Sequence, residues 1–305
     1  MTRATQMVGW PARGLPSRWG RIAALLVLGL WLVPGRTAAA PPRTTLHYAP
    51  NHNFALDGTF LPAKAGFNLA DVSGPNDFRH LRPGNSALIW IGRCNGVDES
   101  FVRLMQTFSG VTNLFGFMLM DDPDPRLLAK VSNPSHACPV DNLRAEVDWI
   151  HAHFAGAKAV IVLMNMGSAS QPSFKDTYEP SNSHVDLFGL AAYPCRTDLG
   201  GCDYDIIDRY VGAASEAGIS SDHVVPIYQT FGEGDWVAGT GRYIMPDATQ
   251  ETAILSRWHQ LVPAPDMDMA YSWGSQRGDR ALENSAELQA IFAKHNTTTA
   301  NELVP

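Results

Sequence analysis

The sequence has no run of lysine or arginine residues, and neither half of the chain is basic. Its 305 residues include 23 basic and 30 acidic residues. Five of the basic residues lie within the first forty positions, so residues 41–305 carry 18 basic and 30 acidic residues, a formal charge of −12. Binding to a phosphate backbone requires clustered lysine and arginine. We therefore expect no nucleic-acid partner.

The sequence also lacks an apolar run long enough to cross a bilayer, which takes about 20 residues. Residues 22–33, IAALLVLGLWLV, form an apolar run that follows four arginines and precedes Pro34, Gly35 and a TAAA tract. A basic start, a short apolar centre and a small-residue site are typical of an export signal. We predict a signal peptide over residues 1–40 and cleavage near Ala39 or Ala40. An uncleaved membrane anchor is the alternative.

Cysteine is scarce, and the four cysteines form neither a C-x2-C element nor a pair flanked by histidines. Zinc and other metal ions are therefore not expected, and nothing indicates a cofactor. An even number of cysteines in an exported chain favours disulfides. Cys195 and Cys202 enclose a turn-rich segment. We therefore predict the pairs Cys195–Cys202 and Cys94–Cys138 among the three possible pairings.

The chain has no glycine-rich phosphate-binding turn after any apolar run, which argues against an open doubly wound sheet, the alternative fold. Instead, apolar runs alternate with amphipathic stretches, which predicts a parallel sheet covered by helices. The predicted strands are 65–71, 86–92, 114–120, 159–165, 185–193, 224–229 and 269–274, with 44–49 as a possible eighth. The predicted helices are 98–108, 141–154, 204–218, 248–262 and 281–295. Residues 41–305 are thus predicted to form one α/β domain, a TIM-type (β/α)8 barrel.

Acidic, amide and aromatic residues follow the predicted strands, where barrel enzymes build their sites. Carboxylates act as acids, bases or nucleophiles in glycoside hydrolysis, and aromatic faces cover sugar rings. This composition predicts a site for sugars. The candidate catalytic residues are Asp71, Asp121, Asp122 and Glu233, and the candidate substrate-binding residues are Trp90, Asn95, Asn165, Tyr193, Gln229, Trp236 and Trp273.

Several short motifs resemble those of secreted bacterial barrel proteins related to glycoside hydrolases. They are GFMLMDDPDP (116–125), the Cys138-Pro139 pair, AAYPC (191–195), CDYDIID (202–208) and YQTFG (228–232). Those proteins usually end this strand in Asp-Glu-Pro, and in the wider barrel glycosidases the acid before the proline is the proton donor. The resemblance implies that Asp122 is the proton donor and that Asp121 is the polar residue before it.

The sequence departs from the resembled pattern at two positions. Asp122 is one methylene shorter than the usual glutamate, and Gln229 stands where retaining enzymes carry a nucleophilic glutamate. An amide cannot form a glycosyl ester. Asp71 or Glu233 could supply the second carboxylate, the substrate's own acetamido group could attack, or catalysis could be absent. The two acids could also simply begin a turn before Pro123.

The sequence therefore predicts a secreted or periplasmic monomer that hydrolyses O-glycosidic bonds of a glycan or polysaccharide by carboxylate acid/base catalysis. After signal cleavage, no stable membrane insertion is expected. One alternative is a non-catalytic carbohydrate-binding barrel. A polysaccharide deacetylase is a weaker alternative, because it needs two histidines at i and i+4, and none of the ten histidines is so spaced.

Overall fold

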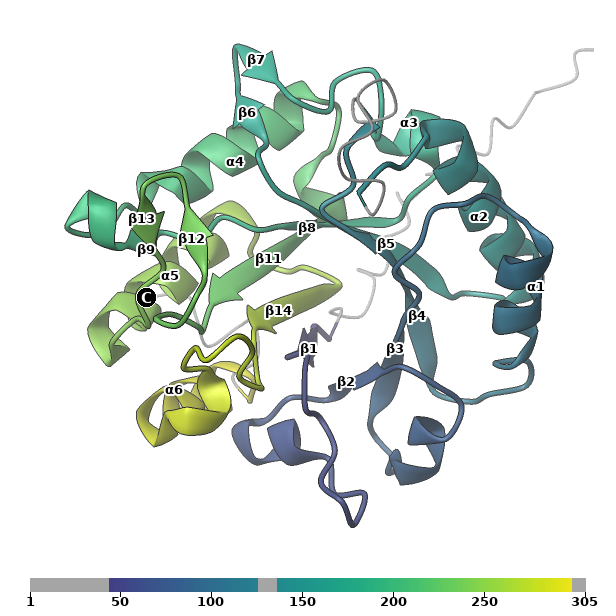
Figure 1. The fold of residues 1–305 in the computed structure, drawn as a ribbon, viewed down its shortest axis with the longest axis horizontal. Coiled ribbons are helices and arrows are strands. Elements are labelled where there is room, and N and C mark those ends of the chain that lie inside the picture. The colour runs from purple at the N-terminus through teal and green to yellow at the C-terminus, as the bar shows by residue number, and fades with distance from the viewer. Residues whose placement is uncertain (1–43, 126–135, 298–305) are drawn as a thin grey trace, which may run out of the picture. The chain divides into compact units, whose positions relative to one another are not determined.

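The computed structural model describes residues 44–125 and 136–297, which contain a closed barrel of parallel strands (Figure 1). Around the barrel the strand order is β1, β14, β11, β8, β5, β4, β3 and β2. The strands are β1 (Leu46–Tyr48), β2 (Leu69–Val72), β3 (Ser86–Trp90), β4 (Leu114–Asp121), β5 (Lys158–Leu163), β8 (Leu187–Leu190), β11 (Val224–Gln229) and β14 (Met267–Tyr271). The predicted (β/α)8 fold is confirmed, and segment 44–49 does supply the eighth strand. The predicted signal peptide lies outside the described residues.

Helices surround the barrel, and all five predicted helical segments are helical. The α-helices are α1 (Glu99–Gln106), α2 (Val140–His153), α3 (Pro180–Ser183), α4 (Asp205–Glu216), α5 (Ala248–Leu261) and α6 (Ala286–His295). Short 3₁₀ turns are η1 (Leu61–Ala65), η2 (Asp77–His80), η4 (Thr197–Leu199), η5 (Ser221–His223) and η6 (Leu282–Asn284). Asp98 caps α1 by accepting a hydrogen bond from the Phe101 N–H. None of these described helices is long and apolar enough to cross a membrane.

Three small hairpins, which we did not predict, project from the loops after barrel strands. They are β6/β7 (Gly167–Ser168 and Gln171–Pro172), β9/β10 (Cys195–Arg196 and Gly201–Cys202) and β12/β13 (Val237–Ala238 and Gly241–Arg242). Two-residue strands carry too little apolar periodicity to be recognised in a sequence. The hairpins β9/β10 and β12/β13 follow strands β8 and β11, so they belong to the rim of the barrel.

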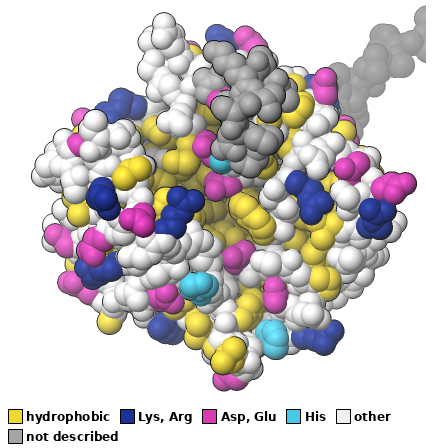
Figure 2. Space-filling model, in the orientation of Figure 1, with side chains coloured by type: hydrophobic (Ala, Val, Ile, Leu, Met, Phe, Trp, Pro, Cys, Tyr) yellow, Lys and Arg dark blue, Asp and Glu magenta, His cyan; other side chains and the backbone are white. Residues whose placement is uncertain are grey.

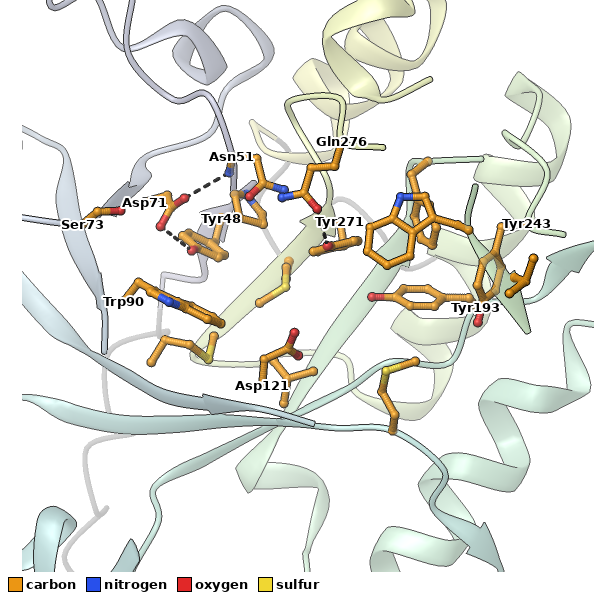
Figure 3. Close-up of a pocket in the computed structure, with 18 residues that line it drawn as sticks. Tyr48, Asn51, Asp71, Ser73, Trp90, Asp121, Tyr193, Tyr243, Tyr271 and Gln276 are labelled. Atoms are coloured by element: carbon orange, nitrogen blue, oxygen red, sulfur yellow. Dashed lines mark hydrogen bonds between the residues drawn. The ribbon is translucent and has the colours of Figure 1, made fainter. Parts of the chain in front are cut away.

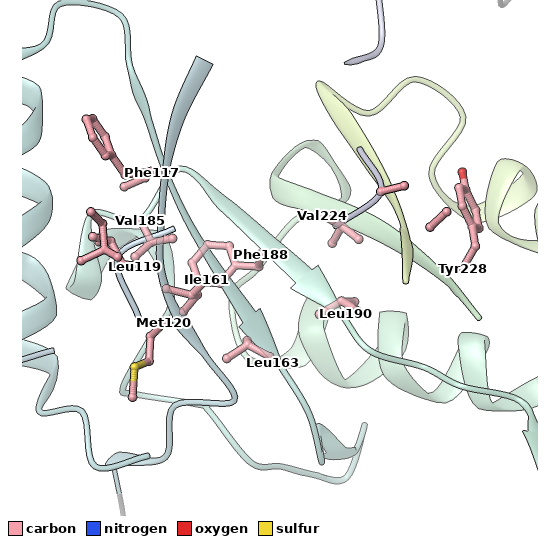
Figure 4. Packing of buried hydrophobic residues seen from close by; sticks show 14 of the residues in the cluster. Phe117, Leu119, Met120, Ile161, Leu163, Val185, Phe188, Leu190, Val224 and Tyr228 are labelled. Carbon is pink, nitrogen blue, oxygen red and sulfur yellow. The ribbon is translucent and has the colours of Figure 1, made fainter. Parts of the chain in front are cut away.

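The hydrophobic core has two parts because successive strand residues point to opposite faces. One part fills the barrel and includes Leu69, Leu88, Met118, Val160 and Met267. The other part lies between the strands and the helices, and Figure 4 shows a portion of it. The outer part is the larger because each strand there faces a helix as well as its neighbouring strands.

Strand β4 contains a β-bulge that reverses the direction of its last side chains. The register between β4 and β5 shifts between Met118 and Met120, so that Met118 pairs with Val160 and Met120 pairs with Ile161. Leu119 and Met120 therefore both belong to the outer core, although they are consecutive residues. A bulge inserts one extra residue into a strand and changes which side chains face which side. Asp121, the next residue, faces the barrel interior as a result.

Both predicted disulfides are confirmed, Cys94–Cys138 and Cys195–Cys202. The first closes a loop with a sequence separation of 44 residues and ties the segment after β3 to the start of α2. The second closes a separation of 7 residues and joins the two strands of the β9/β10 hairpin. Among the described residues there is no free cysteine.

A buried histidine–aspartate cluster joins the last helix to the barrel. Asp268 of β14 accepts hydrogen bonds from His47 of β1 at 2.9 Å and from His295 of α6 at 3.2 Å. Burial opposes ionisation of Asp268, but the two histidines outweigh it and hold the pKa of Asp268 well below its usual value. Within the described residues these three side chains are a possible metal-ligand group, with ligand atoms within 4.8 Å of one another. The three groups already satisfy one another, so the cluster needs no ion to explain it.

Glu251, in the first turn of α5, is completely buried, and neither carboxylate oxygen has a hydrogen-bond partner. Burial raises the pKa of Glu251 well above its usual value, so folding takes up a proton. The free energy of unfolding must then fall as the pH rises above the unfolded-state pKa of the carboxyl group.

We expect Glu251→Gln to stabilise the protein by about 1–3 kcal/mol at pH 8, since a glutamine does not have to take up a proton when the protein folds. The gain should shrink toward zero at pH 4, where the acid is protonated in the folded state and mostly protonated in the unfolded state. Thermal unfolding at both pH values measures this difference. Glu216→Gln, at the exposed end of α4, is the matched control and should show no such pH-dependent gain. An equal gain at both pH values would contradict the assignment of Glu251 as a buried titrating acid.

Candidate functional site

A cavity of about 570 Å³ opens at the carboxyl ends of the barrel strands, where sites of this fold assemble. Figure 2 shows hydrophobic and acidic side chains gathered in the hollow at the centre of this face. The lining residues are mostly aromatic, methionine and acidic side chains: Tyr48, Pro50, Asn51, Asp71, Ser73, Trp90, Met118, Asp121, Val162, Met164, Tyr193, Phe231, Trp236, Val237, Tyr243, Met269, Tyr271 and Gln276. The volume lies within the roughly 300–1,000 Å³ that small-molecule sites occupy.

Asp121 is the last residue of β4, and its carboxylate points into the cavity (Figure 3). Its side chain is accessible to water in the cavity but is surrounded by the protein walls. This desolvation, together with the negative charge of neighbouring Asp122, raises the pKa of Asp121 to about 6, against a smaller opposing effect of His136. A carboxyl group with a pKa near 6 can hold and release a proton near neutral pH, as a general acid must.

Asp71 lies near the end of β2, on another side of the same cavity (Figure 3). Its carboxylate accepts hydrogen bonds from the Tyr48 hydroxyl at 3.1 Å and from the Asn51 backbone N–H at 3.0 Å. Burial raises the pKa of Asp71, while these two hydrogen bonds act in the opposite direction and stabilise the charged form. Asp71 is therefore a fixed acceptor whose position is set by the end of β1 and the loop that follows it.

An aromatic wall stands opposite Asp71. The Tyr193 ring contacts Phe231 edge-to-face with ring centroids 4.9 Å apart, and it contacts Tyr243 at 5.5 Å. Tyr271 joins this group, with its ring centroid 5.4 Å from that of Phe231. Edge-to-face packing holds each ring rigidly, so the wall offers preformed apolar surface suited to the face of a sugar ring.

The residues of the β14 loop support the rim of the cavity. The Trp236 indole N–H donates to the Asp279 carboxylate at 3.1 Å, and the guanidinium of Arg277 lies 4.4 Å from the Trp236 ring centre. The Tyr271 hydroxyl donates to the Gln276 side-chain oxygen at 3.2 Å. These contacts link the β12/β13 side of the rim to the loop after β14.

Asp122, the residue to which the resemblance assigned the proton donor, is not among the residues that line the cavity. Its backbone has a positive φ of 49°, and its N–H donates to the Val162 carbonyl at 2.9 Å. Its own carbonyl is 3.0 Å from His136 Nδ1. The bulge in β4 is the physical reason, since it brings Asp121 to the cavity in place of the following residue.

Three other predicted site residues also lie outside the cavity lining. Glu233 is exposed, and its carboxylate is 3.2 Å from the Arg280 guanidinium. Asn95 is exposed in the loop after β3, next to Gly96, whose N–H donates to Glu146. Asn165 is exposed beyond the end of β5 and has a positive φ of 54°. Their predicted functional roles have no support from their positions.

Gln229 and Trp273 are buried and do not line the cavity. The Gln229 side chain is inaccessible and bonds to backbone groups of Cys195, Phe231 and Ile244, so it joins the loops after β8 and β11. Trp273 lies in the outer core against Phe67. Strand β14 ends two residues earlier, at Tyr271, so the alternation of side chains along the strand does not extend to Trp273. Both side chains have a structural role in this position.

The structure brings five of the predicted residues together at the cavity, Asp71, Trp90, Asp121, Tyr193 and Trp236. Several lining residues escaped the sequence analysis, among them Tyr48, Asn51, Tyr243, Tyr271 and Gln276. Tyr48 and Tyr271 are the last residues of the observed strands β1 and β14, whereas the predicted strands 44–49 and 269–274 run past them. Tyr243 and Gln276 lie in loops, where no periodic pattern marks them.

Comparison with known proteins shows similarity in fold only. No protein-family model and no curated protein matches the sequence. A chitinase-like agglutinin from Robinia pseudoacacia is similar with a TM-score of 0.51 and 11% identity, over 84% of this chain and 99% of that one. A putative β-galactosidase from Bacteroides fragilis has a TM-score of 0.52 and 9% identity, over 84% of this chain and 42% of that one. β-Glucuronidase 2 from Bacteroides uniformis has a TM-score of 0.47 and 9% identity, over 76% of this chain and 31% of its own length.

The protein is thus similar in fold to glycoside hydrolase-like TIM barrels. It spans less than half of the two bacterial proteins, whose remaining parts have no counterpart in the match. A fold of this kind hosts many activities, so the activity has to be argued from the residues at the cavity.

Proposed function

We propose that this protein is a secreted glycoside hydrolase in which Asp121 is the general acid. The observation that carries the proposal is the Asp121 carboxyl group, which faces an aromatic-lined cavity at the mouth of the barrel and has a pKa of about 6. In its protonated form it donates a proton to the glycosidic oxygen as the bond to the sugar breaks, while a water molecule adds to the anomeric carbon of the sugar and releases a proton. This role replaces the assignment to Asp122, which lies outside the lining.

Asp71 is the second carboxylate in this proposal. Hydrolysis of a glycoside passes through a transition state with positive charge on the sugar ring. The Asp71 carboxylate is held by Tyr48 and Asn51 at the same cavity, so its charge is in place before that positive charge develops. The faces of Trp90 and Tyr193 then cover the sugar rings.

Release of reducing ends tests this function. The purified protein is incubated with a panel of polysaccharides that differ in sugar and linkage, and new reducing ends are counted. We expect hydrolysis of at least one member by the wild-type protein, and hydrolysis slower by about 10²- to 10⁴-fold by Asp121→Asn. Activity that is equal in the two proteins would come from a contaminant or another residue, and it would exclude Asp121 as the acid.

The second candidate function is a non-catalytic carbohydrate-binding barrel. The observation that favours it is Gln229, which stands where a nucleophilic glutamate is expected and is tied entirely to backbone groups. Binding of a glycan without any release of reducing ends would support this candidate over hydrolysis. Loss of that binding on Trp90→Ala would then place the binding surface at the cavity, since Trp90 lines it and is 41% exposed.

Export and a monomeric state are part of the proposal. Two disulfides suit an oxidising compartment outside the cytoplasm, and the sequence before residue 41 has the composition of an export signal. The expected substrate is a glycan met outside the cell. Mass determination of the exported protein checks the cleavage near Ala39 or Ala40.

A further inference from the structure

The charged side chains that line the cavity are all acidic. Among the described residues, those lining the cavity include two carboxylates, Asp71 and Asp121, and no lysine, arginine or histidine. Arg277 contacts the lining through the Trp236 ring but does not itself line the cavity. Recognition of a carboxylate or sulfate on a sugar uses guanidinium or ammonium groups, which this lining does not provide. A uronic acid would meet two negative charges and no positive one.

A positively charged ligand, by contrast, finds two kinds of partner in the same place. The Asp71 carboxylate accepts one hydrogen bond from the Tyr48 hydroxyl and one from the Asn51 N–H, and a carboxylate has about four acceptor sites. Aromatic faces also attract cations, and Tyr48, Trp90 and Tyr271 line this part of the cavity. An ammonium group beside Asp71 would therefore form an ion pair with its carboxylate. No basic side chain among the described residues that line the cavity provides such a partner.

We propose that the cavity takes a glycan with free amino groups, a polymer of hexosamine units that are not N-acetylated, and that Asp71 binds the ammonium group. The inference rests on the proposed function for the identity of the site. The formal charge of −12 on residues 41–305 also attracts a cationic polymer from a distance at low salt.

Paired oligosaccharides test the inference directly. The probes are β-1,4-linked glucosamine and α-1,4-linked galactosamine tetramers, each in free-amine and fully N-acetylated form. Binding is measured by calorimetry at pH 5.5 with the Asp121→Asn protein, so that hydrolysis of the probes is slow. We expect at least one free-amine tetramer to bind ten-fold or more tightly than its N-acetylated partner, and higher salt to reduce that preference.

A second substitution separates Asp71 from the general negative charge of the protein. In the Asp121→Asn protein, adding Asp71→Asn should reduce the free-amine preference below three-fold. Asp235→Asn is the matched control, because Asp235 is an exposed carboxylate beside Trp236 that does not line the cavity. An equal loss of preference in the Asp235 variant would overturn the inference.

Other outcomes also decide the matter if the Asp71 variant does not fold. Equal or tighter binding of the N-acetylated tetramers, or no binding of any tetramer, overturns the inference. So does binding of a tetralysine peptide as tight as that of the free-amine tetramers, because charge alone would then suffice. A free-amine preference in a wild-type protein that hydrolyses neither form supports the inference and rejects the hydrolase. If the wild-type protein hydrolyses the N-acetylated tetramers faster than the free-amine tetramers, the hydrolase is supported and the inference is rejected.

Discussion

Asp121→Asn is expected to lower kcat on a glycan substrate by about 10²- to 10⁴-fold, the usual contribution of a general acid, with KM little changed. The reason is that the donated proton matters in the transition state and much less in the bound ground state. Steady-state kinetics on a substrate whose leaving group needs protonation measures the effect. Full activity of the variant on such a substrate would remove Asp121 from the mechanism.

The same variant should not be less stable than the wild type. Burial and Asp122 raise the pKa of Asp121 to about 6, above its unfolded value, so its ionisation lowers the free energy of unfolding as the pH rises through 6. An asparagine does not ionise, and we expect the variant to unfold at an equal or higher temperature at pH 7. A loss of activity in a stable protein then points to chemistry rather than to misfolding.

Asp122→Asn is the matched control, because it changes the adjacent acid that does not line the cavity. Activity should persist, since the donor is intact. The charge of Asp122 contributes to the raised pKa of Asp121, so its removal should lower that pKa. The acid is active when protonated, and kcat/KM of the wild type should fall as the pH rises through about 6. In Asp122→Asn this decline should begin at lower pH.

Removal of the Cys94–Cys138 disulfide by a double alanine substitution is expected to lower the free energy of unfolding by about 4 kcal/mol. The disulfide closes a sequence separation of 44 residues, and the loop-entropy model relates the stabilisation to that length. The bond also attaches the segment after β3 to the start of α2. Denaturant unfolding of the non-reduced proteins measures the difference.

The Cys195–Cys202 pair provides an internal comparison, because it closes a separation of only 7 residues. The same model gives a smaller loss of roughly 2–2.5 kcal/mol for its removal. A larger loss for the short loop than for the long one would show that loop entropy does not set the order. Local packing of the β9/β10 hairpin, which Gln229 holds through Cys195, would then dominate.

The sequence alone was sufficient for the strands, the five main helices and both disulfides. Runs such as 114–120 and 159–165 are apolar on both faces, because each strand is covered by the barrel core on one side and helices on the other. That pattern is local and can be read along the chain. The disulfides followed because four cysteines leave only three pairings and because Cys195 and Cys202 enclose a turn-rich segment.

The sequence also indicated the end of the barrel at which the cavity lies, since Asp71, Trp90 and Tyr193 all lie at or just after the ends of apolar strands and all line the cavity. It did not reveal the loop residues Tyr243 and Gln276, whose positions depend on how the β12/β13 hairpin and the β14 loop close over the rim. Contacts between segments far apart in the chain leave no periodic trace in either segment.

Which of two adjacent acids reaches the cavity was decided only by the tertiary structure. Strict alternation from Met118 would send Met120 and Asp122 inward, but the bulge against β5 turns Leu119 and Met120 both outward and leaves Asp121 facing the cavity. A one-residue shift reverses every following side chain of a strand. The bulge depends on the pairing of β4 with a strand that begins nearly 40 residues after β4 ends, so the residues around Asp121 do not encode it by themselves.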